Sequence, residues 1–367
     1  RIMQKIRVNP FRCYQLSFWA KTQNLEPSHL FRVEVWGRSE RRLMTFTPRM
    51  QATEDWRRVT VGFNSLDRNE VLVYIGVWGG LRGRVWIDDI KIQEVGIVNV
   101  LLRPGTPVTV TSADGRTMFE EGRDFEPIVD ENLNYHVDHP EVSIDILPGG
   151  RIRDGDRLRV TYYQGLALMN SQIAMCMSEP EAYVLWEREI EIVREHLAPK
   201  RYFLGFDEVR QGGWCKRCEQ RGLTAGEILG DCITRLTEMI RSRDPGADVF
   251  VWSDMLDPNH NAGESDFLFK GDFSGSWKHI PDDLIIACWW FKERKKSLQH
   301  FDDLGHPTLA AGYYDAPTPE AAIENARGWL EALGKTRGGC GIMYTTWRDQ
   351  YDDLEVFSDV ISGYKEK

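Results

Sequence analysis

The spacing of apolar residues along the chain changes from a two-residue period to a helical period about halfway. Through residues 1–95, apolar and polar positions alternate in runs such as Cys13–Ala20 and Val71–Val77, separated by turn residues. Such alternation is typical of half-buried β-strands and predicts a β-sandwich. A second β-rich stretch, residues 96–165, predicts a small β subdomain that follows the sandwich.

From residue 166 onward, short apolar runs alternate with amphipathic segments, which is the pattern of βα units. Thr224–Glu227 and Ser178–Glu181 have the sequence of capping boxes, and Thr318 precedes a first-turn proline, Pro319. One segment has five apolar residues at helical spacing: Ile228, Leu229, Ile233, Leu236 and Ile240. Strands are expected at residues 172–177, 202–206, 248–252, 284–290, 308–313 and 341–347.

A closed (β/α)8 barrel needs eight strands and about 250 residues. Residues 166–367 therefore predict a (β/α) barrel that lacks its first strands, with an open sheet as the alternative. We expect an upstream segment to complete the barrel, because the chain opens on Arg1 rather than Met and enters a strand-like alternation at once.

Acidic and aromatic residues follow almost every expected strand in this part of the chain. Asp207 and Glu208 end the run Tyr202–Phe206, and active sites of parallel sheets gather at the carboxyl ends of strands. Because side chains alternate along a strand, only a bend would let both acids meet one substrate. The alternative is an Asp that caps the next helix beside a solvated Glu. Further candidates at strand ends are Trp252, Asp254, Trp289, Trp290, Tyr313, Tyr314, Trp347 and Asp349.

This mixture of carboxylates and aromatic rings suits a carbohydrate, because carboxylates accept hydrogen bonds from hydroxyl groups and rings stack on sugar faces. Glycoside cleavage usually needs one acid to protonate the leaving oxygen and a second group to stabilise or attack the anomeric carbon. We assign Glu208 as the acid and Asp207 as the group that remains charged. The expected partner is an oligosaccharide or a glycoconjugate.

Composition narrows the choice of partner. The chain has 367 residues and a net charge of -10, and no long Lys/Arg run is present, which argues against nucleic acid. No stretch approaches the roughly 20 apolar residues of a membrane helix. We expect no membrane partner, and a secreted or periplasmic location is favoured.

The seven cysteines do not form the dense framework of a small secreted domain. Cys215-Lys216-Arg217-Cys218 is a C-x-x-C pair, which predicts a thiol pair or disulfide that stiffens the loop after Glu208. Half of a zinc site is the alternative, although a second pair at metal spacing is missing. Most of the other cysteines are expected to be buried. The histidines His260, His279, His300 and His306 are too scattered to predict a metal cluster, and surface or capping roles are expected for them.

The N-terminal quarter resembles the jelly-roll carbohydrate-binding modules found beside bacterial polysaccharide-degrading enzymes. The residues that carry the resemblance are "YQLSFWAKT", "WRRVTVGF" and "VLVYIGVWGGLRGRVWIDDIKI". It implies aromatic platforms for sugars, for which Trp36 and Trp78 are candidates, while Trp56 and Trp86 are expected in the core. It also implies a structural calcium ion at an acidic turn, which Asp88 and Asp89 match in part. No other cofactor is expected.

The segment "YFLGFDEVRQGGW" resembles the hexosaminidases of glycoside hydrolase family 20, whose signature is a Gly followed closely by Asp-Glu at the end of the fourth barrel strand. The resemblance covers about residues 171–367 and implies substrate-assisted, retaining catalysis, in which the 2-acetamido oxygen of the substrate attacks the anomeric carbon. It implies that Asp207 orients the acetamido group and that Glu208 acts as acid and then base. It also implies a tryptophan cage and a tyrosine donor, drawn from Trp252, Trp289 or Trp290, Trp347, and Tyr313 or Tyr314.

This chain departs from the family pattern at two places. The usual His-x-Gly-Gly lead-in is replaced by Tyr202–Phe206, and the late Trp-Ser-Glu becomes Trp347-Arg348-Asp349. Two alternatives therefore stay open. One is a two-carboxylate glycosidase on neutral sugars with Asp254 or Asp349 as the second group, where the separation of the carboxyl groups would distinguish retention from inversion. The other is a carbohydrate-binding protein without activity.

Overall fold

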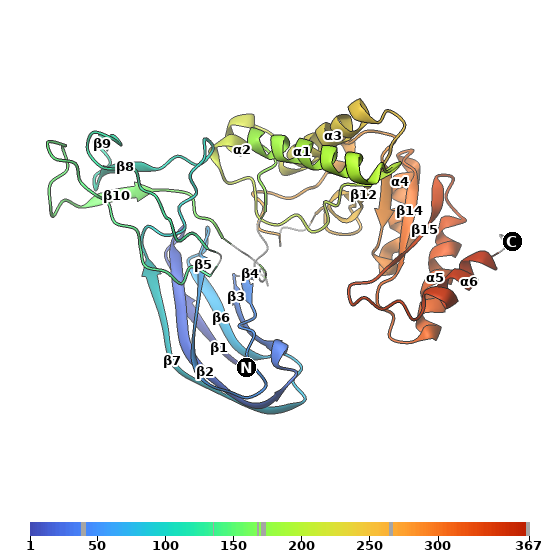
Figure 1. Cartoon of the computed structure of the whole chain (residues 1–367), viewed down its shortest axis with the longest axis horizontal. Coiled ribbons are helices and arrows are strands. Elements are labelled where there is room, and N and C mark those ends of the chain that lie inside the picture. The colour runs from blue at the N-terminus through green and yellow to red at the C-terminus, as the bar shows by residue number, and fades with distance from the viewer. Residues whose placement is uncertain (38–41, 135, 167–168, 170–173, 264–266, 365–367) are drawn as a thin grey trace. The chain divides into compact units, whose positions relative to one another are not determined.

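The computed structural model describes residues 1–37, 42–134, 136–166, 169, 174–263 and 267–364, and the chain divides into two compact units (Figure 1). The first unit comprises Arg1–Ala174 and Cys215–Arg217, and the second comprises Met175–Trp214 and Cys218–Lys367. Each unit has its own sheets and its own buried core. None of the helices in the described part of the chain is long and apolar enough to cross a membrane.

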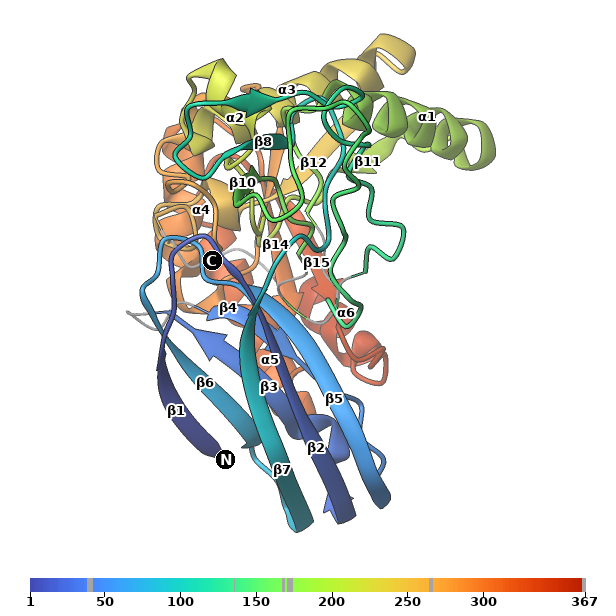
Figure 2. The same cartoon turned by 90° about the vertical axis from the view of Figure 1, so that its left-hand side faces the viewer.

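The N-terminal strands of the first unit form two antiparallel sheets that face each other as layers (Figure 2). One sheet has the order β1-β6-β3-β4 and the other the order β5-β2-β7. The strands are β1 (Ile2–Arg7), β2 (Cys13–Glu26), β3 (Phe31–Trp36), β4 (Arg42–Phe46), β5 (Glu54–Asn64), β6 (Glu70–Val77) and β7 (Arg82–Val95), with a 3-10 turn η1 (Ser28–Leu30). Leu16 and Phe18 of β2 are buried, and the Phe18 ring meets Phe31 of the other sheet at 6.3 Å. The alternating run Cys13–Ala20 thus faces the core with every second residue, as predicted.

Trp56 and Trp86 lie on the exposed side of their sheet, so the prediction that they belong to the core is wrong. The strand register explains their position. Trp86 is paired with Lys21 of β2, two residues from the exposed Trp19, whereas the buried residues of β2 occupy the alternate positions. Trp56 is one residue from Arg57, which pairs with Ala20, and therefore shares the face of Trp19 and Lys21.

The second sheet system of the first unit is small and antiparallel. It contains β8 (Thr109–Ser112), β9 (Met118–Phe119) and β10 (Leu158–Thr161) in the order β10-β8-β9. Its core includes Val110, Phe125, Ile128 and Ile152. The buried Asp124 carboxylate pairs with Arg151, and this hydrogen-bonded ion pair lowers the pKa of Asp124. This stretch is β-rich as expected, and the three-part domain division at residues 95 and 165 stays a prediction.

The second unit is built on a parallel sheet whose strands run in chain order, β11-β12-β13-β14-β15. They are β11 (Arg201–Phe203), β12 (Asp248–Trp252), β13 (Ile285–Cys288), β14 (Thr308–Tyr313) and β15 (Gly339–Thr345). In the described part of the chain, β11 and β15 are edge strands, so the sheet has the form of part of a barrel. The strand expected at residues 172–177 is absent over residues 174–177, and residues 172–173 lie outside the described residues.

Helices precede, connect and follow the strands of this sheet, and the longest of them, α3 (Ala225–Arg243), buries one apolar face. They are α1 (Pro180–Leu197), α2 (Lys216–Arg221), α3 (Ala225–Arg243), α4 (Arg294–Asp303), α5 (Pro319–Leu333) and α6 (Leu354–Ser362), with 3-10 turns η3 (Asp254–Leu256), η4 (Ser276–Lys278) and η5 (Phe291–Glu293). In α3 the buried residues include all five that the helical spacing selected. The helical period of the sequence is therefore confirmed for this element.

All three predicted helix starts are confirmed, two of them with the predicted cap. Thr224 and Glu227 form a reciprocal capping box before α3, and the Thr318 side chain accepts from Ala321 N at the start of α5. The third helix, α1, begins at Pro180 as expected, but no side chain caps it, so the capping box predicted at Ser178–Glu181 is wrong. The Ser178 hydroxyl instead lies 3.4 Å from both the Cys218 sulfur and an Arg221 guanidinium nitrogen, which leaves it engaged away from the helix.

Candidate functional site

The backbone turns sharply where β11 reaches the acidic pair. The strand is expected to run to Phe206, but β11 ends at Phe203, although Leu204 N still donates to Phe250 O at 2.9 Å. Gly205, Phe206 and Glu208 then adopt positive φ values of 78°, 67° and 44°. Left-handed conformations are unfavourable for residues with a side chain, so the surrounding contacts must hold them. This is the bend that two adjacent acids need in order to serve one site.

Asp254, which lies in the η3 turn after β12, holds the bend. Its carboxyl oxygen Oδ2 accepts from Glu208 N at 2.8 Å and from Asn261 Nδ2 at 2.9 Å, and Oδ1 accepts from Trp289 Nε1 at 3.3 Å. The side chain is fully buried, and this burial raises its pKa to about 6. The three hydrogen bonds oppose the shift, while the charge of Asp207 adds to it. Asp254 therefore supports the loop rather than facing solvent.

The Glu208 carboxylate lies closer to the surface, with 42% of its side chain exposed. Arg210 donates to its Oε2, and the Arg210 guanidinium also lies over the Phe267 ring, 5.3 Å from the centroid. Sequence reasoning did not single out Arg210, although it stands two residues after Glu208 in the quoted segment. The candidate acid is thus reachable from solvent and has a cation beside it.

The rest of the loop is fixed against a second segment, Phe267–Lys270. Gln211 N donates to Phe267 O at 2.7 Å, Lys270 N donates to Gly212 O at 3.0 Å, and Trp214 Nε1 donates to Leu268 O at 2.8 Å. A Cβ atom at Gly212 would come within 2.2 Å of the Phe269 ring. The glycine is therefore required by close approach, and the loop after Glu208 is an ordered element.

Aromatic rings from the next two strand ends lie beside these acids. Trp289 stacks on Tyr314 with ring centroids 6.1 Å apart and an interplanar angle of 18°. Trp290 and Tyr314 are 40% and 52% exposed. The pKa of Tyr314 is raised, first by burial and then by the charges of Glu208, Asp315 and Asp207. Tyr314 therefore lies on the side of the acidic pair.

The other sequence candidates are placed differently. The Trp252 ring packs on Phe203 at 4.6 Å. Tyr313 is buried, and its hydroxyl donates to Asp353 at 3.1 Å, so it belongs to the core of this unit. Trp347 is exposed, and its backbone N donates to Asp315 at 2.9 Å, which places it beside the residue that follows Tyr314. Asp349 is exposed and has a positive φ of 54°. Contacts thus connect Glu208, Asp254, Trp289, Trp290 and Tyr314, and the charge of Asp207 acts on both Asp254 and Tyr314. Trp252 joins them through its backbone N, which donates to Gly205 O at 3.0 Å, whereas the Tyr313 side chain lies in the core.

Two residues of this cluster were not predicted. His260 lies against Trp289 and Trp290 with centroids 4.3 and 4.9 Å apart, and burial lowers its pKa to about 4. Asn261 donates to Asp254, as described above. The signal for both was the density of polar residues in "SDMLDPNHN" directly after a strand.

Surface or capping roles are expected for the four histidines; His279 is exposed, whereas His306 is buried and so has no surface role. His260 and His300 are half-buried. Burial lowers the pKa of His300 and of His306, so both favour the neutral form more than a surface histidine would.

Acidic side chains, which are potential metal ligands, occur both at the acidic site of the second unit and at the acidic turn of the sandwich. Within the described residues, no His, Asp or Glu of the acidic site belongs to a group of three that could hold an ion. In the sandwich, Asp88 and Asp89 lie within β7, and the Asp89 carboxylate pairs with Lys91 at 2.8 Å. The calcium ion expected at that turn stays a prediction.

Comparisons with known proteins give structural neighbours only. No family model matches the chain, and no curated protein matches it. A CBM4 structure is 20% identical over 25% of this chain and 59% of its own, with a TM-score of 0.22. The beta-N-acetylhexosaminidase of Bacteroides fragilis is 14% identical over 55% of this chain and 44% of its own, with a TM-score of 0.38.

A third neighbour, the Bifidobacterium dentium beta-glucuronidase complexed with coumarin-3-O-glucuronide, is 10% identical over 94% of this chain and 60% of its own, with a TM-score of 0.29. The chain thus spans between 44% and 60% of the length of these three structures. At low identity and low TM-score, the structures to which this chain is similar include glycoside hydrolases and a carbohydrate-binding module.

Proposed function

We propose that the second unit carries the active site of a glycoside hydrolase that removes terminal sugars, with an N-acetylhexosamine as its substrate. One observation carries the proposal. Asp207 and Glu208 follow a parallel strand through a left-handed bend, and their charges act on the partly exposed Tyr314, whose ring stacks on Trp289. Paired acids next to aromatic faces at the carboxyl edge of a parallel sheet suit a sugar ring and its glycosidic bond.

In the proposed reaction, Glu208 donates a proton to the glycosidic oxygen while the 2-acetamido oxygen of the substrate attacks the anomeric carbon. The leaving group departs with that proton, and a cyclic intermediate remains. Asp207 orients the acetamido N–H and stabilises the positive charge that develops on the group. Water then attacks the anomeric carbon, Glu208 accepts its proton, and the sugar is released with its configuration retained.

The neighbouring residues have supporting roles in this proposal. Tyr314 donates to the acetamido oxygen, and Trp289, Trp290 and Trp347 line the acetamido methyl group. When substrate enters, Arg210 leaves its ion pair with Glu208 and contacts the substrate instead. Asp254 holds the Glu208 backbone in its left-handed conformation through the 2.8 Å hydrogen bond.

The test is release of nitrophenol from nitrophenyl glycosides, with the N-acetylglucosaminide, the N-acetylgalactosaminide and their neutral counterparts in one panel. Removal of a general acid costs about 10² to 10⁴ in rate, so Glu208→Gln should lower kcat by that amount. Glu331→Gln, on the exposed side of α5, is the matched control and should leave kcat unchanged. Equal turnover by wild type and Glu208→Gln would contradict the assignment.

Participation of the acetamido group needs its own measurement. Replacing the N-acetyl group of the substrate by N-trifluoroacetyl makes the attacking oxygen less nucleophilic. We expect kcat/KM to fall more than tenfold under the proposed mechanism. Unchanged kcat/KM, or turnover of neutral sugars alone, would favour the two-carboxylate alternative. In that scheme Asp349 is the better second carboxylate, because Asp254 is enclosed and accepts from the loop backbone.

A second function is favoured by the exposed face of the sheet β5-β2-β7. Trp19, Trp56 and Trp86 are 40%, 42% and 38% exposed, and the register places them on one face. We propose this face, rather than Trp36 and Trp78, as the sugar platform of the sandwich. The ring of Trp36 is covered by Arg42, and its Nε1 donates to Glu34. A polysaccharide pull-down that is unchanged by Trp19→Ala and Trp86→Ala would rule this out.

A further inference from the structure

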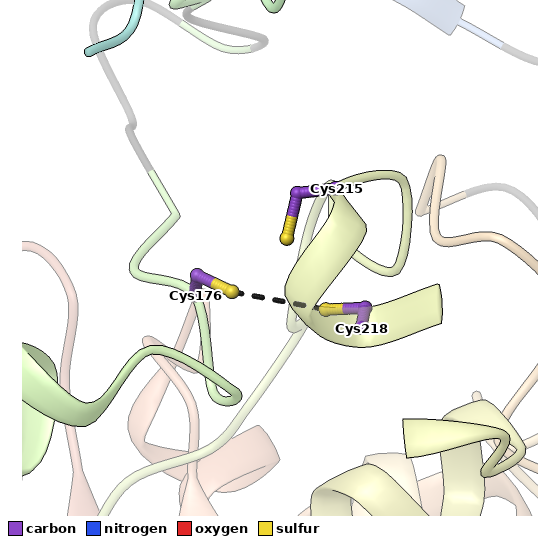
Figure 3. Close-up of side chains that lie close together, drawn as sticks. All are labelled: Cys176, Cys215 and Cys218. Carbon is purple, nitrogen blue, oxygen red and sulfur yellow. Dashed lines mark hydrogen bonds between the residues drawn. The ribbon is translucent and has the colours of Figure 1, made fainter. Parts of the chain in front are cut away.

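Three cysteine side chains converge at the end of the loop that carries the acidic pair. Cys215 and Cys218 belong to the C-x-x-C segment at the start of α2, and Cys176 precedes α1. Their sulfur atoms all lie within 4.8 Å of one another and point toward one another (Figure 3). Cys176 and Cys218 both belong to the second unit, and Cys215 is close to Cys218 because only Lys216 and Arg217 separate them in the chain. The second pair of ligands that the sequence lacks is thus replaced in part by one cysteine, Cys176, which is distant in the chain.

The spacing of the sulfurs suits a metal ion better than a disulfide. The Cys176 and Cys218 sulfurs are 3.7 Å apart. A disulfide requires about 2.05 Å. A tetrahedral zinc ion with zinc–sulfur bonds of about 2.3 Å separates its sulfurs by about 3.8 Å. The distance between these two cysteines is thus that of two corners of one zinc tetrahedron.

The surroundings also suit thiolates. Cys215 and Cys218 are 7% and 5% exposed. Three thiolates around a divalent ion leave one net negative charge, and Lys216 and Arg217 stand between the two cysteines in the chain. The thiolate is the form of cysteine that binds metal. The Ser178 hydroxyl, 3.4 Å from the Cys218 sulfur, is the adjacent oxygen for the fourth position, directly or through water.

The remaining cysteines lack this arrangement. Cys13 and Cys232 are buried, and burial raises their pKa values to about 12 and about 11. Cys288 is also buried, and Cys340 is exposed. In the described part of the chain, these four do not join any group of three close ligands.

We propose that Cys176, Cys215 and Cys218 bind one zinc ion, or another thiophilic divalent ion, at a structural site. The ion would fasten α2 to the segment before α1. It would thereby fix the far end of the loop that starts at Asp207, whose middle is already pinned to Phe267–Lys270. The site is independent of the hydrolase proposal, since a sugar-binding protein would use the same anchor.

The test uses the whole chain, purified without chelators and with any affinity tag removed. Elemental analysis should find about one zinc per chain. After removal of the zinc, added Co²⁺ should give the near-ultraviolet charge-transfer absorption of cobalt–thiolate bonds. Cys176→Ser, Cys215→Ser and Cys218→Ser should each weaken zinc binding at least tenfold, whereas the control Cys340→Ser should not.

The zinc content and the cobalt absorption of the wild-type protein test the proposal even if a cysteine variant fails to fold. Less than one tenth of a zinc per chain after loading of the reduced protein with zinc would overturn the proposal. So would cobalt absorption that survives all three substitutions. Loss of glycosidase activity alone would leave it standing, because zinc content is measured separately.

Discussion

The charge state of the Asp254 carboxyl group depends on the fold around the acidic site. It is enclosed by protein, and burial raises its pKa to about 6 from the ordinary value of 3.8. The folded state therefore binds a proton more tightly than the unfolded chain does. Stability contributed by this group is present at low pH and is lost as the pH rises from about 4 to about 6.

Asp254→Asn should remove that dependence. The shift corresponds to about 3 kcal/mol, because each pKa unit is worth about 1.4 kcal/mol. We expect the free energy of unfolding of the variant, relative to wild type, to rise by about that amount between pH 4 and pH 7. Urea unfolding at the two pH values, followed by tryptophan fluorescence, measures the difference. A constant difference across this range would show that Asp254 does not titrate there.

The adjacent tyrosines at the end of β14 give a matched pair of variants. Tyr314 faces the acids, whereas the Tyr313 hydroxyl donates to Asp353 in the core. Tyr314→Phe should lower kcat/KM for an N-acetyl substrate about tenfold or more and leave stability unchanged. Tyr313→Phe should cost about 1 kcal/mol of stability, the usual worth of a hydrogen bond, and leave kcat/KM unchanged. If Tyr313→Phe lowered kcat/KM and Tyr314→Phe lowered stability, Tyr313 would be the residue that contacts substrate.

At the residue scale, the acidic pair was predictable because two adjacent carboxylates end an apolar run. The choice between Tyr313 and Tyr314 was not, since it depends on the positive φ values of 74° and 50° that turn the two side chains apart. The role of Asp254 as a support was also hidden. It follows from hydrogen bonds to Glu208, Asn261 and Trp289, which come from different segments of the chain.

At the scale of elements, α3 shows how a helix depends on its neighbour as well as on its own sequence. Its capping box and five of its buried residues could be identified from the sequence alone. Its Gly230 could not, because the reason for a glycine lies in another segment. A Cβ atom there would come within 2.4 Å of His279 Cβ and 2.7 Å of His279 O.

Gly230→Ala should therefore destabilise the protein, although alanine is the better helix former by about 1 kcal/mol. Overpacking costs about 1–3 kcal/mol, and here the backbone of the η4 turn would have to move. Gly246→Ala is the control, because a Cβ atom there would meet nothing within 4 Å and its φ is not positive. Urea midpoints should fall for Gly230→Ala and not for Gly246→Ala. A rise for Gly230→Ala would mean that the η4 turn yields.

Most element types followed from periodicity in both halves, with the strand expected at residues 172–177 as an exception, but the ends of several strands did not. The run Tyr202–Phe206 reads as one strand, yet β11 ends at Phe203 because the next residues turn into left-handed conformations. The tryptophans of β5 and β7 were assigned to the wrong face. Alternation fixes which residues share a face, but which face is covered depends on the second sheet, and a single strand does not contain that information.

At the scale of the whole molecule, the proposed sugar platform and the proposed hydrolytic site belong to different units. Trp19→Ala combined with Trp86→Ala should abolish retention on insoluble polysaccharide and leave kcat on a soluble nitrophenyl glycoside unchanged. Glu208→Gln should do the opposite. Joint loss of both properties in either variant would show that the two sites do not act separately.

The hydrogen bond from Trp289 to Asp254 gives this protein a built-in optical indicator. An indole that donates to a carboxyl group changes its emission and its near-ultraviolet dichroism when that group gains or loses a proton, and here the pKa of the acceptor is about 6. The difference spectrum between wild type and Trp289→Phe should then titrate near that pH. The same signal would report occupancy by a ligand that displaces water around Trp289, without any label or substrate turnover.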